Sequence, residues 1–298
     1  MIDRAGFLAA LLATGGLDIW DDDPGPSGTT IRVVLPNGSI AALDLEKYLR
    51  GVVPLESPPG WPEAALQAQA IVARTYAVGK RNLTRPFDVQ ANDADQHYGG
   101  PAAERPSTNA AVDSTRGMTL RYNGGAVSIF YSSCCGGHTA DAASMWGRTG
   151  LPYLRGVTDD PNCTGSPDYR WRRTIPVDRA RALLDDRMRG AIASFDLTDV
   201  DGSGRPRTAI VRDDGGGSAA ITIADLRGRF GTDIVRSLWI RTITIDRTQA
   251  APMIVIEGCG RGHGVGLCQW GARGLAIAGA DAAAILTHFF PGTEVSGV

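Results

Sequence analysis

Lysine is nearly absent from this 298-residue chain: only Lys47 and Lys80 occur, so arginine supplies almost all of the 30 basic residues. Glutamate is also scarce, and aspartate supplies most of the 32 acidic residues. A GC-rich coding bias is the simplest explanation of both shortages. The net charge of −2 excludes a general attraction to nucleic acid or to anionic membranes, so we expect no nucleic-acid partner. The few glutamates form a short set of candidates: Glu46, Glu56, Glu63, Glu104, Glu257 and Glu294.

Long apolar runs are missing as well. No stretch reaches 18 apolar residues, which predicts that no helix crosses a membrane. The apolar run over residues 5–13 follows a lone Arg4 and has no clean small-x-small cleavage site. Residues 1–30 are therefore expected to be an N-terminal tail or a weakly signal-like segment, with a short helix as the alternative. A composition of 43% hydrophobic and 21% charged residues excludes a disordered chain.

Hydrophobic periodicity and turn residues predict helices and strands without βαβ alternation. A hairpin is expected where Pro36-Asn37-Gly38 separates two short strands. The strongest helix signal covers 62–80, with Pro62 in its first turn and an apolar stripe of small residues. Residues 81–108 and 134–175 are predicted to be mostly loop. Further helices are expected at 45–49, 177–190, 224–230 and 269–290, and further strands at 116–133, 195–213, 218–224, 239–246 and 252–257.

This order of elements predicts an α+β fold with a mainly antiparallel sheet and packed helices. The chain is long enough for one large domain or two modest ones. We predict one domain over 31–298, in which 170–250 is a candidate subdomain.

Glu56 is the most distinctive glutamate, because four prolines and an indole surround it in the segment VVPLESPPGWP. Such a stiff, partly apolar setting favours the neutral carboxylic acid, the form that a general acid needs. The N-terminus of the following helix favours the charged form instead, so the sequence leaves open which form of Glu56 is favoured. Glu46 and Glu63 are interpreted as solvated helix residues. Arg74 lies in an apolar helix and is either a buried, ion-paired residue or a polar group lining a cleft.

Two dense clusters carry further polar groups. The run GCGRGHGVGLCQWG is no phosphate-binding loop, because the lysine of that motif is missing. Within it, His263 is a candidate for a sugar contact, a metal ligand or a turn cap. The run SSCCGGHT brings Cys135 close to His138, which suggests a cysteine hydrolase or, more weakly, a metal site. Cys135 is equally suited to a disulfide with Cys163 or Cys268, and the odd total of five cysteines leaves at least one thiol unpaired.

Taken in order, these segments resemble the SpoIID/LytB family. The resemblance covers roughly residues 30–295 and includes DQHYGG, GGHT and GHGVGLCQWGA. Each motif is weak alone, whereas all of them in order form a strong signal. The segments that carry it are 45–56, 61–70, 73–77, 95–100, 115–117, 136–139, 146, 152–154, 262–272 and 285–293.

The resemblance implies a cell-envelope or secreted protein that acts on peptidoglycan. It implies a lytic transglycosylase that cleaves MurNAc-GlcNAc bonds of denuded glycan strands and forms 1,6-anhydro-MurNAc. The alternative is a non-catalytic, cell-wall-binding enhancer of an N-acetylmuramoyl-L-alanine amidase, with that amidase as its partner. The catalytic glutamate of the family falls on Glu56, and Trp61 and Trp270 are candidates for stacking on sugar rings. The polar residues expected to bind the glycan are Arg74, Gln96, Tyr98, His138, His263 and Gln269.

The expected reaction requires no cofactor. Some relatives hold zinc near the active site through Cys and His ligands, but their ligand spacing is not reproduced around His138. Zinc therefore remains an option here, with candidate ligands Cys135, His138, Cys163 and Cys268. A disulfide between Cys135 and Cys163 is the preferred interpretation.

Overall fold

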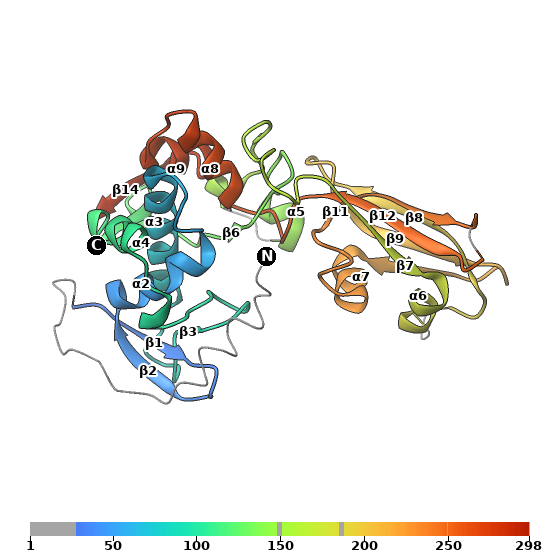
Figure 1. Ribbon diagram of the computed structural model, residues 1–298, viewed down its shortest axis with the longest axis horizontal. Coiled ribbons are helices and arrows are strands. Elements are labelled where there is room, and N and C mark those ends of the chain that lie inside the picture. The colour runs from blue at the N-terminus through green and yellow to red at the C-terminus, as the bar shows by residue number, and fades with distance from the viewer. Residues whose placement is uncertain (1–27, 148–150, 185–187, 249, 298) are drawn as a thin grey trace. The chain divides into compact units, whose positions relative to one another are not determined.

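The structure is a computed structural model that describes residues 28–147, 151–184, 188–248 and 250–297. Most of the predicted tail, residues 1–27, lies outside the described residues. The chain divides into two compact units (Figure 1). Unit 1 contains the described residues up to Ile129, Gly279–Thr287 and the strand after Gly292, and unit 2 contains Phe130–Ala278 and His288–Pro291.

Unit 1 combines helices with two small sheets. One sheet has the order β2-β1-β3 and the other the order β14-β4-β5. A 3-10 turn at Pro101–Ala103 precedes α4, and α9 (Ala282–Phe289) begins in this unit. The remaining elements are β1 (Thr30–Val34), β2 (Ile40–Asp44), α2 (Leu45–Glu56), α3 (Glu63–Lys80), β3 (Val89–Gln90), α4 (Pro106–Ser114), β4 (Met118–Tyr122), β5 (Gly125–Ala126) and β14 (Thr293–Gly297).

Local chemistry fixes both ends of α2. The carboxylate of Asp44 caps the helix by accepting hydrogen bonds from the backbone N–H groups of Glu46 and Lys47, at 2.9 and 3.2 Å. The helix ends at Glu56 because Ser57 precedes a proline and is extended, with φ −131° and ψ 125°. This end places Glu56 on the last helical position.

The core of unit 1 forms where α2 and α3 pack together and against β1 and β3. Small residues on α3, such as Ala70, Ala73 and Ala77, are fully buried and allow close approach of its neighbours. The larger members include Tyr48, Leu49 and Val52 of α2. The predicted stripe of small residues on this helix is therefore its packing face.

Unit 2 contains two antiparallel three-stranded sheets, with the orders β10-β9-β8 and β11-β12-β7, and the parallel pair β13-β6. A second 3-10 turn covers Pro152–Leu154. The other elements are β6 (Tyr131–Ser132), α5 (Ala142–Trp146), β7 (Trp171–Pro176), α6 (Val177–Leu183), β8 (Ile192–Val200), β9 (Pro206–Asp213), β10 (Ser218–Thr222), α7 (Ile223–Phe230), β11 (Trp239–Asp246), β12 (Met253–Cys259), β13 (Leu267–Cys268) and α8 (Gln269–Ile277).

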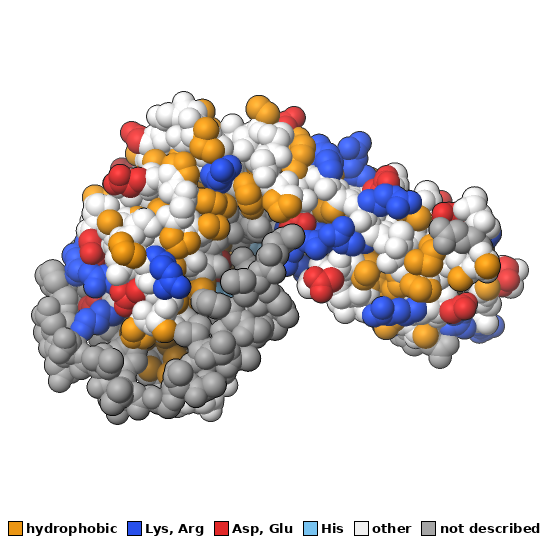
Figure 2. Space-filling model, viewed as in Figure 1, with side chains coloured by type: hydrophobic (Ala, Val, Ile, Leu, Met, Phe, Trp, Pro, Cys, Tyr) orange, Lys and Arg blue, Asp and Glu red, His pale blue; other side chains and the backbone are white. Residues whose placement is uncertain are grey.

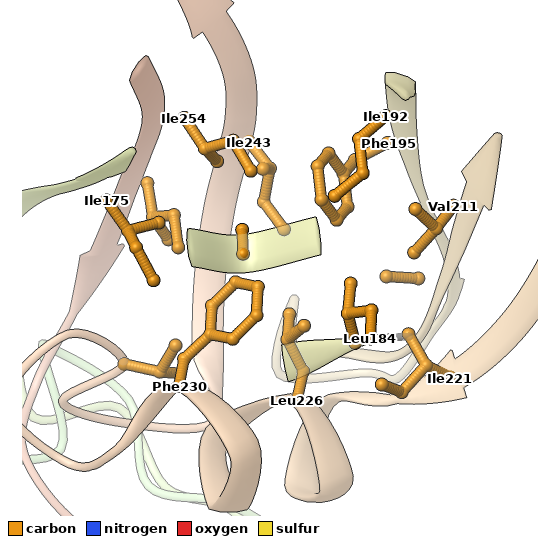
Figure 3. Close-up of a cluster of buried hydrophobic side chains, with 14 of the residues drawn as sticks. Ile175, Leu184, Ile192, Phe195, Val211, Ile221, Leu226, Phe230, Ile243 and Ile254 are labelled. Atoms are coloured by element: carbon orange, nitrogen blue, oxygen red, sulfur yellow. The ribbon is translucent and has the colours of Figure 1, made fainter. Parts of the chain in front are cut away.

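A hydrophobic core lies between these strands and α6 and α7. Figure 3 shows Phe230 and Leu226 of α7 pointing toward Ile243, Ile254 and Phe195 of the strands. All five side chains are buried. Since this core draws its residues from Trp171 to Ile256, it coincides with most of the candidate subdomain at 170–250, whose status as a domain stays a prediction.

The predicted α+β class is confirmed, because helices and mostly antiparallel sheets are both extensive. Three expectations were incomplete. The first short helix continues to Glu56, and the expected loop over 81–108 contains the start of α4. The expected hairpin at 116–133 forms only as the short antiparallel pair β4-β5, because β6, at the end of this range, pairs with β13 instead.

No helix among the described residues is long and apolar enough to span a bilayer. Figure 2 shows that basic and acidic side chains are interspersed on the visible face of unit 2. This mixture agrees with the net charge of −2 and gives that face no single-sign field.

Candidate functional site

The candidate catalytic carboxylate, Glu56, is half-buried at the end of α2. Its Oε1 accepts a hydrogen bond from the backbone N–H of His97 at 3.0 Å. This bond joins two segments 41 residues apart in the sequence and fixes the orientation of the carboxylate.

The segment that anchors Glu56 is itself fastened to α2. The backbone N–H of Gly99 donates to the carbonyl of Gly51 at 3.1 Å. Tyr98 covers Gly51 so closely that a Cβ there would lie 2.5 Å from the tyrosine ring. Tyr98 also packs against Tyr48, with ring centroids 5.2 Å apart. Glycine at position 51 is therefore the residue that lets the 95–100 segment lie flat on the helix.

Gln96 is fully buried beneath this segment. Its Oε1 accepts a hydrogen bond from the Tyr48 hydroxyl at 3.2 Å, and its Nε2 donates to the carbonyl of Ala73 at 3.4 Å. Burial, together with the negative charges of Asp95 and Glu56, raises the pKa of Tyr48 well above its usual value, so the phenol stays protonated as a donor. Gln96 thus supports the segment that anchors Glu56, and its amide is occupied within the protein.

Asp95 is committed to structure as well. Its Oδ1 accepts hydrogen bonds from Tyr76 at 2.8 Å and lies 2.9 Å from the Lys80 ammonium, while Oδ2 accepts from the Gln90 backbone at 2.9 Å. These contacts tie the segment to α3 and β3. Asp95 is therefore held in place by the fold, and the acid–base role expected of Glu56 stays a prediction.

Arg74 does not line a cleft. Its side chain is completely buried and donates to both carboxylate oxygens of Glu46, to the hydroxyl of Thr115 and to the carbonyls of Val112 and Met118. The expectation of a glycan contact is corrected in favour of the buried, ion-paired alternative. Glu46, expected to be solvated, is only 1% exposed. The signal for its burial was its helical position, since Glu46 shares a face of α2 with Leu49 and Val53.

His138, His263 and Gln269 all lie in unit 2. Val265 donates its backbone N–H to Nδ1 of His263 at 3.0 Å, so the neutral ring carries its proton on Nε2. Burial lowers the pKa of His263 to about 4, and the ring packs beside Trp146 with centroids 5.1 Å apart. His263 is therefore a neutral hydrogen-bonding group near neutral pH.

His138 has the opposite tautomer. Its Nδ1 lies 2.7 Å from the carbonyl oxygen of Thr139, which can only accept, so Nδ1 carries the proton. Gln269 is buried at the first position of α8. The next residue, Trp270, is half-buried and has the guanidinium of Arg273 stacked 5.2 Å from its ring centroid. Trp61, the other candidate for sugar stacking, is half-buried in unit 1.

The cysteines form a different arrangement from the one expected. All five are free, and Cys135 and Cys163 approach with their Sγ atoms 3.7 Å apart, whereas a disulfide requires about 2.05 Å. The predicted disulfide between Cys135 and Cys163 is therefore wrong. Cys135, Cys163 and Cys268 do gather, as the candidate ligand set requires, but the fourth member of the group is Asp159 and not His138. Sequence reasoning missed Asp159, although it lies only four residues before Cys163.

The same geometry argues against a cysteine hydrolase. The Cys135 thiol is buried, and its Sγ contacts Asp159 at 3.0 Å and Cys163. His138 lies outside this group, so the two residues are not arranged as a nucleophile and its base.

Unit 2 also contains a cavity of about 530 Å³, separate from these residues. Its arginines are partly neutralised, since Arg172 lies 3.4 Å from Glu257. None of the predicted site residues lines it. The lining residues are Arg170, Trp171, Arg172, Arg241, Thr242, Glu257 and Gly258.

The sequence of the chain is similar to that of several known proteins. Residues 37–122, which include Glu56 and the 95–100 segment, match the SpoIID family, described as stage II sporulation protein. The chain is 33% identical over 257 residues to an uncharacterized protein of Brachyspira hyodysenteriae, and this alignment covers 85% of the chain and 67% of that protein.

Two relatives from Bacillus subtilis carry functional names. The chain is 30% identical to an amidase enhancer over 293 residues, which cover 83% of the chain but only 40% of the enhancer. It is 28% identical to a stage II sporulation protein D over 277 residues, covering 87% of the chain and 76% of that protein. The chain belongs to the SpoIID/LytB family.

Proposed function

We propose that this protein is a peptidoglycan lytic transglycosylase with Glu56 as its acid–base residue. The observation that supports this most is the anchored carboxylate: Glu56 ends α2 and accepts the backbone N–H of His97, within a segment fastened to the same helix. The similarity to stage II sporulation protein D adds support. We expect the protein to act in the cell envelope or outside the cell, where its substrate is located.

One carboxylate is sufficient for this reaction. Glu56 first donates its proton to the glycosidic oxygen between MurNAc and GlcNAc, and the C1–O bond breaks. The resulting carboxylate then takes the proton of the MurNAc C6 hydroxyl, whose oxygen bonds to C1 and closes a 1,6-anhydro ring. No water is consumed, and Glu56 regains its proton. A glycosidase that hydrolyses this bond normally needs a second carboxylate.

The test uses glycan strands freed of stem peptides by an amidase. The wild-type protein should release products that end in 1,6-anhydro-MurNAc, and mass spectrometry in H₂¹⁸O should show no incorporated ¹⁸O. Glu56→Gln should lose at least about 100-fold in activity, because general acid–base groups contribute factors of that size. Glu63→Gln, which changes an exposed glutamate on the neighbouring helix, is the matched control.

Full activity of the Glu56→Gln variant would overturn the proposal. Products that carry ¹⁸O would show hydrolysis instead of internal ring closure, and would equally contradict it.

A second candidate function rests on the amidase enhancer of Bacillus subtilis. In that case the protein binds glycan and stimulates a cell-wall amidase without cutting glycan itself. The two functions separate in a mixed assay: an enhancer should raise the amidase rate equally with Glu56 or Gln at position 56, and should create no new glycan ends on its own.

A further inference from the structure

Four buried side chains from three segments of unit 2 converge on one point. Each supplies one donor atom, these atoms all lie within 4.8 Å of one another, and no side chain is more than 1% exposed. We infer that they form a four-ligand zinc site that joins the three segments into one structural centre. The ligands are Cys135, Asp159, Cys163 and Cys268.

The spacing of the sulfur atoms fits a metal better than a disulfide. Zn–S bonds of about 2.3 Å in a tetrahedron separate two sulfurs by roughly 3.8 Å. The Sγ atoms of Cys135 and Cys163 are 3.7 Å apart. A set of three thiolates and one carboxylate favours Zn²⁺ over hard cations such as Mg²⁺ and Ca²⁺, which prefer oxygen ligands.

Asp159 is oriented as a metal-bound carboxylate would be. Its Oδ2 faces the Cys135 sulfur at 3.0 Å, while its Oδ1 accepts a hydrogen bond from Nδ2 of Asn162 at 3.2 Å. Nε2 of His288 lies 3.8 Å from the same Oδ1, and within the described part of the chain this buried nitrogen has no hydrogen-bond partner. The bond from Asn162 is of the kind that holds a ligating carboxylate from outside the coordination shell.

Backbone N–H groups point at the sulfurs. Cys268 Sγ accepts from the amides of Cys135 and Gly271, at 3.2 and 3.3 Å, and Cys135 Sγ accepts from Gly137 at 3.4 Å. Amide donors stabilise the negative charge of a thiolate, the form of cysteine that binds zinc. Three such contacts around two of the sulfurs are therefore a second indication of a metal centre.

Gly271 makes room for the carboxylate. A Cβ at this position would lie 2.3 Å from Asp159 Oδ2, which no side chain can tolerate. The start of α8 therefore approaches the group as closely as a backbone can, and the position gives a way to disturb the site without removing a ligand.

A site with four protein ligands has no open position for substrate, so its role is structural. On binding, each thiol loses a proton to solvent as its sulfur bonds to zinc, and no atom changes oxidation state. The ion then fixes Cys135 relative to the N-terminus of α8, where Gln269 and Trp270 begin the helix.

Metal analysis of the full-length protein tests this inference directly. We expect about one zinc per chain after purification without chelators, and loss of zinc in Cys163→Ser and in Asp159→Asn. The matched control is Cys259→Ser, because Cys259 is also buried and free but lies outside the group. Protein that holds no zinc and whose melting temperature does not rise when zinc is added would overturn the inference, as would equal zinc content in Cys163→Ser and Cys259→Ser.

Two further measurements decide the matter if a ligand variant fails to fold. Cobalt(II) added to metal-depleted wild-type protein should give the intense visible bands and thiolate charge-transfer absorption of a tetrahedral thiolate site. Denatured, chelator-treated protein should have five free thiols. A count of three would indicate a disulfide and would contradict the inference, and an octahedral cobalt spectrum would do the same. None of these measurements depends on glycan cleavage.

Discussion

Arg74 donates to both carboxylate oxygens of Glu46, at 2.9 and 2.7 Å, and both side chains are at most 2% exposed. The pair joins α3 to the first turn of α2, the helix that ends at Glu56. The Gly117 backbone N–H also donates to Glu46, at 3.2 Å. The ion pair therefore fastens to α3 the helix that carries the catalytic candidate, without contacting Glu56.

Removing one member of this pair should be severely destabilising. Arg74→Ala leaves the Glu46 charge buried without its partner, which costs about 3–5 kcal/mol. Urea unfolding should show this loss in the unfolding of unit 1. Arg74→Lys should restore little of it, because an ammonium cannot make the paired contacts of a guanidinium. A variant with normal stability but weakened glycan binding would instead support the original expectation of a cleft residue.

Gly51→Ala should disturb the Glu56 anchor without touching Glu56. The new methyl group meets the ring of Tyr98 at 2.5 Å, so the 95–100 segment must move away from α2. Overpacking of this kind costs about 1–3 kcal/mol. We expect a lower melting temperature together with reduced cleavage of denuded glycan.

The matched control for this change is Gly79→Ala, at a helical glycine of the same unit whose nearest contact would be an ordinary 3.5 Å. Equal activity of the two alanine variants would show that the position of the 95–100 segment is unimportant.

Tyr48→Phe should disturb the segment that holds Glu56 less than Gly51→Ala does, because it removes only the hydrogen bond from Tyr48 to Gln96. Loss of the hydroxyl leaves Oε1 of the buried Gln96 without the donor at 3.2 Å, at a cost of about 1–3 kcal/mol. Since the segment also carries the amide that orients Glu56, we expect kcat to fall more than KM rises. A change confined to KM would place Gln96 in direct contact with the glycan.

His263 should make stability depend on pH. Its pKa is lowered from 6.5 to about 4 by burial, so the unfolded chain binds the proton first as the pH falls. The contribution of His263 is fully present above pH 6.5 and is lost as the pH falls toward 4, up to about 3 kcal/mol.

Urea unfolding of the wild type and of His263→Gln across this range should give stability curves that converge at low pH. Parallel curves would show that His263 does not ionise differently in the folded protein. Other titrating groups are common to both proteins and cancel in the comparison.

Local patterns predicted much of the fold. The predicted helix at 62–80 matches α3, and the Pro36-Asn37-Gly38 turn joins β1 to β2 as expected. The helix at Pro106 was missed because its first turn, Pro-Ser-Thr-Asn, has the composition of a loop. The strand partner of β6 lies more than 130 residues away, and no local pattern specifies such a pairing.

Candidate site residues could be named from the sequence only where they lie within a recognisable motif. Glu56 is a candidate because of its flanking prolines and indole and because of the family resemblance; the structure adds the His97 amide that holds it, and its catalytic role stays a prediction. The burial of Glu46 had a local signal in its shared helix face with Leu49 and Val53, whereas the place of Asp159 depends on segments that meet only in the folded chain. In the sequence, Asp159 looks like any solvated loop aspartate, because nothing local shows that Cys135 and Cys268 lie beside it in the folded chain.

The pairing of β14 with β4 has a consequence for biosynthesis. Strand β4 can pair with β14 only after the residues between them, which include all of unit 2, have been translated. Synthesis must therefore reach residue 297 before β14 can complete its pairing with β4 in unit 1. A fragment limited to residues 37–122, the part that matches the family, lacks both β5 and β14, so both edges of β4 are exposed and the fragment should aggregate instead of folding independently.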